Sequence, residues 1–107
     1  MRFAAVDAVG RDIQDGMNRS VIVYGADWCH DTSDTRRHLR DNGIDFEYVN
    51  IDNDPKAEEA VLEWNDGKRR IPTVVINAAD AQMILLNPPS ANLDAALRDA
   101  GILRDAA

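Results

Sequence analysis

Apolar residues follow two patterns along the chain, and these patterns predict its secondary structure. Short runs that are rich in β-branched residues, or that alternate between apolar and polar positions, are typical of buried or half-buried strands. Such runs occupy residues 20–25, 44–51, 73–77 and 82–86. Segments bounded by helix start and stop signals lie between them and predict helices at residues 27–42, 56–65 and roughly 91–100.

Cap and turn residues delimit these predicted helices. Asp27 is the expected N-cap of the first helix, and Asn42-Gly43 is its stop signal. Pro55 suits the first turn of the second helix. The last two helices are expected to bury one apolar face each, made of Ala57, Ala60, Val61 and Trp64 in one and Leu93, Ala96 and Leu97 in the other.

The order β-α-β-α-β-β-α predicts an α/β fold. A helix joins the first two strands, so they should run parallel with a right-handed crossover. A short turn at residues 78–81 joins the last two, so they should run antiparallel. We therefore expect a four-stranded mixed sheet with helices on both faces in residues 20–107, preceded by an N-terminal arm at residues 1–19.

Composition and charge narrow the function. The 107 residues suffice for one small domain, and 12 basic against 19 acidic residues give a net charge of −7. This balance disfavours nucleic-acid and anionic membrane partners. No apolar run approaches the ~20 residues of a spanning helix, and acidic residues interrupt any signal-peptide core near the N-terminus. A single cysteine excludes an internal disulfide, which fits a reducing cytosol, and the abundance of Ala, Asp and Arg fits a bacterial source. We expect a cytoplasmic protein.

The segment Trp28-Cys29-His30-Asp31-Thr32 carries the candidate chemistry, because it lies where the first strand leads into the first helix. Free backbone N–H groups and the positive end of the helix dipole would stabilise the Cys29 thiolate there. Thr32 follows one helical turn later, so its hydroxyl is expected to donate a hydrogen bond to the sulfur. A cis Ile71–Pro72 bond would present the backbone of Ile71 beside the sulfur, where an extended substrate could pair with it.

At these residues the chain resembles the glutaredoxin family of the thioredoxin fold, and within it the bacterial mycoredoxins. The resemblance runs from about Ser20 to Leu103. Trp28-Cys29 follows the first strand, where the family places its nucleophilic cysteine. The segment Arg69-Arg70-Ile71-Pro72 looks like the family's R-T-V-P, and Asn87-Pro88-Pro89-Ser90 looks like the N-P-S of mycoredoxins with one extra proline.

The resemblance implies thiol–disulfide exchange on oxidised proteins, with glutathione or mycothiol as co-substrate and no bound cofactor. Cys29 would attack the mixed disulfide, Arg69 would attract a carboxylate of the small thiol, Ile71 would pair with its backbone, and Ser90 would hold a polar end. The expected site thus comprises catalytic Cys29 and Thr32, with Trp28, His30, Arg69, Ile71, Pro72 and Ser90 around the substrate.

Several departures from the family pattern leave alternatives open. Thr32 replaces the second cysteine of C-x-x-C, which leaves a monothiol mechanism. The C-G-F-S pattern is absent, and Ala26 stands where the family often has Lys. Negative charge near the sulfur, from Asp27, Asp31 and Asp34, opposes its ionisation. The alternatives are a redox-silent thioredoxin-fold module that binds a thiol compound or peptide, and an iron–sulfur cluster shared between two copies.

Two further groups of charged residues have competing interpretations. His30, Asp34 and His38 fall on one helical stripe, but the two histidines would be about 12 Å apart, too far to share one ion. We expect a solvated stripe and no metal. The basic run Lys68-Arg69-Arg70 is either a solvated loop or, beside the predicted cis-proline, an anion-binding site.

Overall fold

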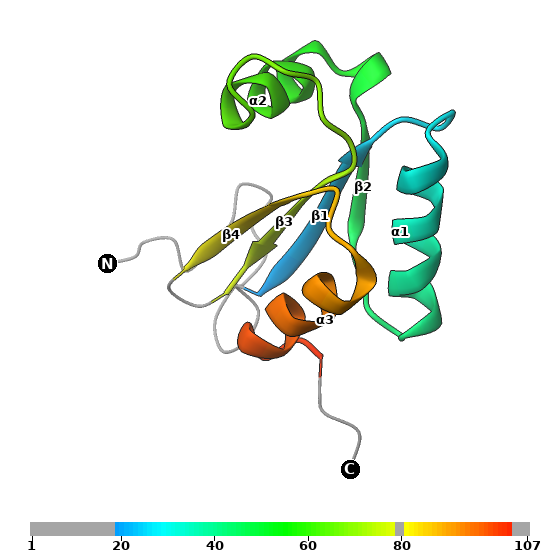
Figure 1. Cartoon of the computed structure of the whole chain (residues 1–107), viewed down its shortest axis with the longest axis vertical. Helices are drawn as coiled ribbons and strands as arrows, with labels where there is room; N and C mark the ends of the chain where they lie inside the picture. The colour runs from blue at the N-terminus through cyan, green and yellow to red at the C-terminus, as the bar shows by residue number, and fades with distance from the viewer. Residues whose placement is uncertain (1–18, 79–80, 104–107) are drawn as a thin grey trace, which may run out of the picture.

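The computed structural model describes residues 19–78 and 81–103. The described strands are β1 (Ser20–Gly25), β2 (Glu47–Asn50), β3 (Thr73–Asn77) and β4 (Gln82–Leu86), and the α-helices are α1 (His30–Asp41), α2 (Pro55–Trp64) and α3 (Ser90–Asp99) (Figure 1). A short 3-10 helix, η3 (Ile51–Asn53), leads from β2 into α2. The predicted order of elements is confirmed, with η3 added. The predicted N-terminal arm lies outside the described residues except for Arg19.

The strands form one mixed sheet in the order β2-β1-β3-β4. As predicted, β1 and β2 run parallel and β3 and β4 run antiparallel, while β1 also pairs antiparallel with β3. Tyr24 near the end of β1 lies opposite Thr73 at the start of β3. The segment that follows β1 and the segment that precedes β3 therefore meet at the same end of the sheet, which brings Cys29 and Ile71 together.

Helices cover both faces of this sheet, as expected. Successive strand residues point to opposite faces. Val23 belongs to the larger core cluster, which contains Leu39 from α1 and Leu93 and Leu97 from α3. The next residue, Tyr24, packs on the smaller cluster around Ile51, Ala57 and Val61, which belongs to η3 and α2. In Figure 1, α1 and α3 accordingly lie together on one side of the sheet.

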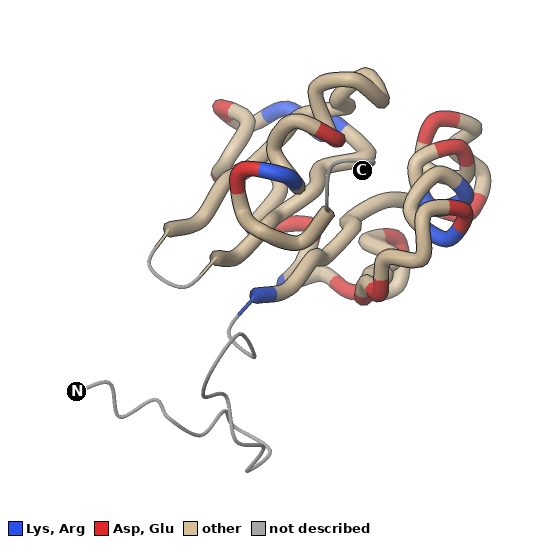
Figure 2. The backbone as a smooth tube through the Cα atoms, turned by 90° about the horizontal axis from the view of Figure 1, so that it is seen from below, with Lys and Arg blue, Asp and Glu red and all other residues tan. Residues whose placement is uncertain are grey.

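Charged residues concentrate on the helices and loops, as Figure 2 shows, and Glu47 is the one charged residue within the four strands. The sheet can therefore be buried in the apolar interior without burying charged side chains. Among the described residues, no helix is long and apolar enough to cross a membrane.

Several boundaries differ from the prediction. The end of α1 and both ends of α2 and α3 lie one residue from their predicted positions, and three other differences have a clear structural cause. Ile44 does not begin β2, because its N–H bonds to the carbonyl of Leu39 (2.9 Å) and closes the end of α1, so β2 starts later, at Glu47. At the other end of β2, the Asn50 side chain accepts a hydrogen bond from the Asp52 N–H (3.0 Å), which turns the chain into η3. The third difference concerns the start of α1, where Asp27 is not the cap.

Candidate active site

Cys29 occupies the N-cap position of α1. Its N–H donates to the carbonyl of Ala26 (3.1 Å), its own carbonyl accepts from the Ser33 N–H (3.1 Å), and its backbone is extended, with φ −82° and ψ 118°. No side chain makes a capping hydrogen bond at this helix end. Cys29 is thus partly exposed in the N-cap position, at the positive end of the helix dipole, a place that in general favours a thiolate.

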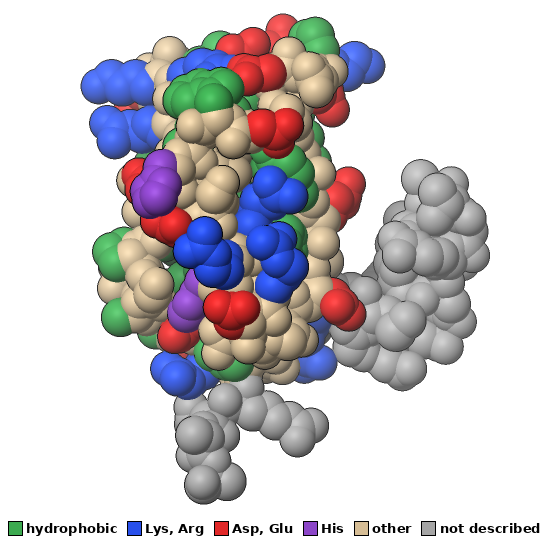
Figure 3. All heavy atoms as spheres, turned by 90° about the vertical axis from the view of Figure 1, so that its right-hand side faces the viewer, with side chains coloured by type: hydrophobic (Ala, Val, Ile, Leu, Met, Phe, Trp, Pro, Cys, Tyr) green, Lys and Arg blue, Asp and Glu red, His purple; other side chains and the backbone are tan. Residues whose placement is uncertain are grey.

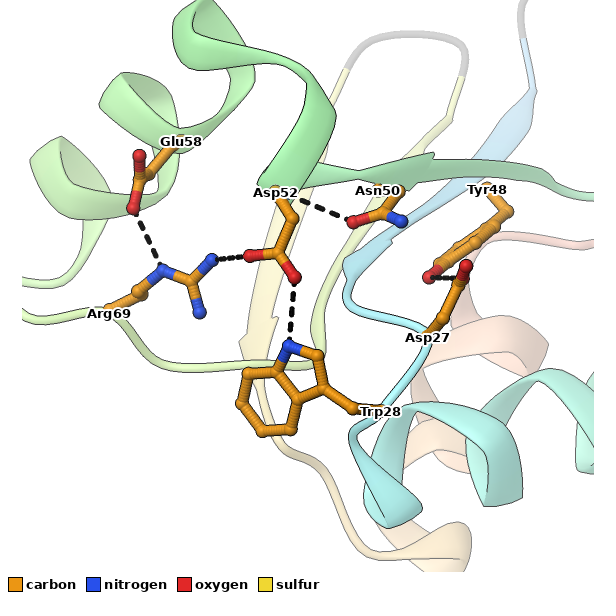
Figure 4. Close-up of polar contacts among 7 residues, drawn as sticks. All are labelled: Asp27, Trp28, Tyr48, Asn50, Asp52, Glu58 and Arg69. Atoms are coloured by element: carbon orange, nitrogen blue, oxygen red, sulfur yellow. Dashed lines mark hydrogen bonds and ion pairs between the residues drawn. The ribbon is translucent and has the colours of Figure 1, made fainter.

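Asp27 does not cap α1, because its carboxylate has a partner on another element. It accepts a hydrogen bond from the Tyr48 hydroxyl on β2 (2.7 Å), as Figure 4 shows. The guanidinium of Arg36 lies over the Tyr48 ring, 3.8 Å from its centre. Burial, followed by the hydrogen bond to Asp27 and its negative charge, raises the pKa of Tyr48 to about 12. The prediction of an Asp27 cap is wrong.

Thr32 is wholly buried one turn into α1. Its hydroxyl has no hydrogen-bond partner among the described residues, so the predicted bond to the Cys29 sulfur is not formed. The side chain instead packs against the backbone of Gly25, where a Cβ would lie only 2.4 Å from Cγ2 and 2.5 Å from Oγ1. Thr32 thus joins α1 to the end of β1.

A shallow pocket of about 290 Å³ opens at the cysteine, lined by Trp28, Cys29, Arg69, Arg70, Ile71, Leu86 and Asn87. Two of its apolar walls are unusually open to solvent, since Trp28 is 67% and Leu86 43% exposed. The Ile71–Pro72 peptide bond is cis, and Pro72 is buried beside the pocket. Within the described chain, the N–H and C=O of Ile71 make no hydrogen bond and are free to pair with a ligand.

A chain of polar contacts fixes one side of the pocket (Figure 4). The indole N–H of Trp28 donates to the Asp52 carboxylate (2.8 Å), and the same carboxylate accepts from the Arg69 guanidinium. Arg69 also donates to Glu58 on α2 (2.8 Å), and this bond raises the pKa of Arg69. Arg69 therefore reaches the pocket as predicted, but its charge is already matched by two carboxylates.

Ser90 and His30 lie apart from the Cys29 pocket. Ser90 begins α3, after Pro89 in the N-cap position, and lines a neighbouring hollow of about 320 Å³ between α1 and the start of α3. Of the lining residues, Asn87 alone is common to the two hollows. The side chain of His30 is 85% exposed, pairs with Asp34 (3.2 Å) and lines neither hollow.

The acidic and histidine side chains of α1 have partners of their own. Asp31 accepts from the Asn87 amide (3.3 Å), and Asp34 also pairs with Arg37 (3.6 Å). His38 does not simply face solvent as predicted, because it is half-buried against Asp94 of α3 (2.8 Å). Figure 3 shows the two histidines separated on this face of the molecule. Across the described residues, no group of three His, Cys, Asp or Glu is placed to hold a metal ion.

Sequence reasoning missed several residues of the site. No sequence motif marks Asp52 or Glu58 as part of the site. They approach Arg69 only because of how η3 and α2 fold over the sheet. Leu86 was assigned only to a strand. Asn87 carried a usable signal, since Asn tolerates the positive φ (43°) that ends β4 here.

The sheet order, the cysteine at the start of the first helix and the cis-proline beside it define a protein of the thioredoxin fold. Within that fold, the chain belongs to the glutaredoxin family, whose family model matches residues 21–79. The family is one of thiol redox proteins.

Individual relatives agree with this assignment. Mycoredoxin 1 from Corynebacterium glutamicum is 34% identical over 55 residues, which cover 51% of this chain and 67% of that protein. The glutaredoxin-like protein NrdH from Escherichia coli is 33% identical over 55 residues, covering 51% and 65%. The crystal structure of a glutaredoxin from Archaeoglobus fulgidus superposes with a TM-score of 0.58 at 24% identity, covering 75% of this chain and 87% of that one, and supports the fold.

Proposed function

We propose that this protein is a monothiol thiol–disulfide oxidoreductase that acts, in a reducing cytosol, on mixed disulfides between proteins and a low-molecular-weight thiol such as glutathione or mycothiol. The observation that carries the proposal is the placement of Cys29. The only cysteine of the sequence is partly exposed at the N-terminus of α1 and lines a pocket beside Ile71.

The exchange takes place in two steps. The Cys29 thiolate attacks the small-thiol sulfur of the mixed disulfide, so that a new S–S bond forms while the old one breaks. The protein substrate leaves as a thiolate and takes up a proton. A second molecule of the small thiol, as its thiolate, then attacks the small-thiol sulfur bound to Cys29. This step releases the symmetrical small-thiol disulfide and regenerates the Cys29 thiolate, and it needs no second cysteine.

The pocket supplies the contacts that such a substrate needs. The free N–H and C=O of Ile71 would pair with the backbone of the small thiol as a short extended strand. Trp28 and Leu86 offer exposed apolar surface to the rest of the substrate. Pro72 is buried next to Ile71 and would act as a structural support of this site.

Mass spectrometry tests the proposal directly. Treatment with glutathione disulfide or mycothiol disulfide should add one small-thiol unit, and excess small thiol should remove it. The Cys29→Ser variant replaces the sulfur with an oxygen and should give no adduct. A wild-type protein that forms no adduct between mildly acidic and mildly alkaline pH would rule out the exchange reaction.

A redox-silent binding module is the second candidate, and two observations favour it. Thr32 makes no hydrogen bond to the sulfur, and Arg69 is already matched by two carboxylates. A module of this kind would bind S-methylglutathione, a thioether that cannot exchange, while glutathione disulfide left Cys29 unmodified. Calorimetry with the thioether and mass spectrometry with the disulfide therefore separate the two candidates.

A further inference from the structure

We infer that Tyr48 is a positioning residue for the exchange reaction, because its hydroxyl holds the Asp27 carboxylate against β2 and so keeps this negative charge away from the start of α1, where the Cys29 thiolate forms. This inference rests on the proposed function. It adds a residue that keeps the sulfur reactive without touching the substrate.

Asp27 is a possible source of negative charge at the sulfur. It precedes Cys29 by two residues, in the turn that the Cys29 N–H closes by donating to the carbonyl of Ala26 (3.1 Å). Among the described residues, no side chain caps α1, and the positive end of a helix attracts a carboxylate. A carboxylate that moved there would stand beside the thiolate, and a like charge at close range opposes ionisation of the sulfur.

The hydroxyl of Tyr48 opposes this movement. It donates to the Asp27 carboxylate from β2 (2.7 Å). In Figure 4 the Asp27 side chain points to Tyr48, and the neighbouring Trp28 side chain points in a different direction. Asp27 accordingly does not line the Cys29 pocket, although Trp28 does. The hydrogen bond therefore holds the only charged side chain of residues 26–29 outside the pocket.

Tyr48 is itself held in place by its surroundings. Its ring is partly buried against the larger core cluster, and its backbone belongs to β2. The guanidinium of Arg36, on α1, lies over the ring at 3.8 Å from its centre. The hydroxyl therefore has a defined position from which it can fix the Asp27 carboxylate.

The other charges around the sulfur do not depend on Tyr48. Those of α1 and of the pocket wall near Cys29 belong to His30, Asp31, Asp34, Arg69 and Arg70, and the charges that face Tyr48 belong to Asp27, Arg36 and Asp52. In the described part of the chain, none of the first group is hydrogen-bonded to Tyr48 or Asp27. They should stay in place when the Tyr48 hydroxyl is removed, so a change at the sulfur can be assigned to Asp27.

The pH dependence of Cys29 alkylation by iodoacetamide tests this inference, because the thiolate is the reacting form and the sequence has no other cysteine. Mass spectrometry follows the rate in the wild type and in Tyr48→Phe, which removes only the hydroxyl. Asp27→Asn removes the charge, alone and combined with Tyr48→Phe. Tyr24→Phe is the matched control, since it removes a tyrosine hydroxyl that makes no hydrogen bond among the described residues and lies on the neighbouring strand β1.

We expect Tyr48→Phe to move the midpoint of the pH–rate profile upward by about 0.3–0.7 pH units, the size of one charge interaction at a helix terminus, and to slow alkylation below the midpoint by about two- to fivefold. Asp27→Asn should restore the wild-type midpoint in the Tyr48→Phe background. Alone, it should change the midpoint little, because the charge is already held away. Tyr24→Phe should leave the midpoint unchanged.

An unchanged midpoint in Tyr48→Phe, an equal shift in Tyr24→Phe, or an upward shift that remains in the double variant would overturn the inference. The exchange reaction would still stand in each of these cases, provided that glutathione disulfide adds one small-thiol unit to wild-type Cys29. If the wild type formed no such adduct, the proposed function itself would fall, and this inference with it.

Discussion

The contact between Gly25 and Thr32 is expected to control how α1, and with it Cys29, is seated on the sheet. Gly25 is buried at the end of β1 and does not have a positive φ, so its backbone would accept alanine. Only the space is missing, because the added Cβ would lie 2.4 Å from Thr32 Cγ2 and 2.5 Å from Oγ1, about 1 Å inside ordinary contact. Gly25→Ala therefore forces α1 away from β1.

The expected cost follows from this overlap. Overpacking of a tight interior contact usually lowers the free energy of unfolding by about 1–3 kcal/mol. Thr32→Ala removes both overlapping atoms. Alone, it loses about 0.8 kcal/mol of methyl burial, but it also removes a buried hydroxyl without a partner, whose burial costs about 1–3 kcal/mol, so Thr32→Ala should leave the free energy of unfolding unchanged or raise it. In the double variant the remaining close contact is the Cβ of residue 32, at 3.0 Å.

Urea unfolding of the wild type, both single variants and the double variant measures this coupling, with the fluorescence of Trp28 and Trp64 as the signal. We expect Gly25→Ala to be the least stable, with a Tm lower by roughly 4–8 °C for each kcal/mol lost. The double variant should recover at least about 1 kcal/mol relative to the sum of the single effects. Additivity within about 0.5 kcal/mol would refute the argument, because sites that share a contact should couple.

Two further predictions concern hydrogen bonds found in the fold. Asp54→Ala removes the side chain that accepts from the Ala57 N–H (3.1 Å) and caps α2, and should lower the free energy of unfolding by about 1 kcal/mol in urea; no change would refute the cap. Tyrosinate absorbance in a Tyr24→Phe background should show Tyr48 ionising with a pKa of about 12, and Asp27→Asn should lower that pKa; a titration near 10 in the parent would contradict it. Because this pKa is raised on folding, the stability that Tyr48 contributes is complete below pH 10 and should be lost as the pH rises from 10 towards 12.

The strands were the most predictable part of the fold. β1, β3 and β4 have the predicted bounds, because β-branched and apolar residues are continuous within each of them and turn residues flank them. The pairing directions also followed from the lengths of the connections. Helix starts were harder to predict. Asp27 has the right chemistry for a cap, but the hydroxyl of Tyr48 competes for its carboxylate from a position 21 residues away.

Some residues of the candidate site could likewise be predicted from the sequence, and others could not. The sequence was enough to place Cys29, Trp28 and Ile71 close to one another. Each lies next to the end of a strand, and a mixed sheet of this order allows few arrangements of its strand ends. Ser90 was predicted to lie in the Cys29 pocket, but it lines the neighbouring hollow. The course of the chain between β4 and α3 is set by packing, which the sequence pattern did not show.

The amino-acid sequence alone was thus enough to define an α/β chain with a single cysteine at the N-terminus of its first helix. Backbone preferences and apolar periodicity act over a few residues and can be recognised without the tertiary structure. The tertiary structure decided which charges remain available. It paired Arg69 with Asp52 and Glu58, which lie 17 and 11 residues away, and left the guanidinium of Arg70 without a partner among the described residues. Ion pairs between distant segments depend on how the helices fold over the sheet. A local sequence pattern therefore cannot predict which of these charged side chains will meet.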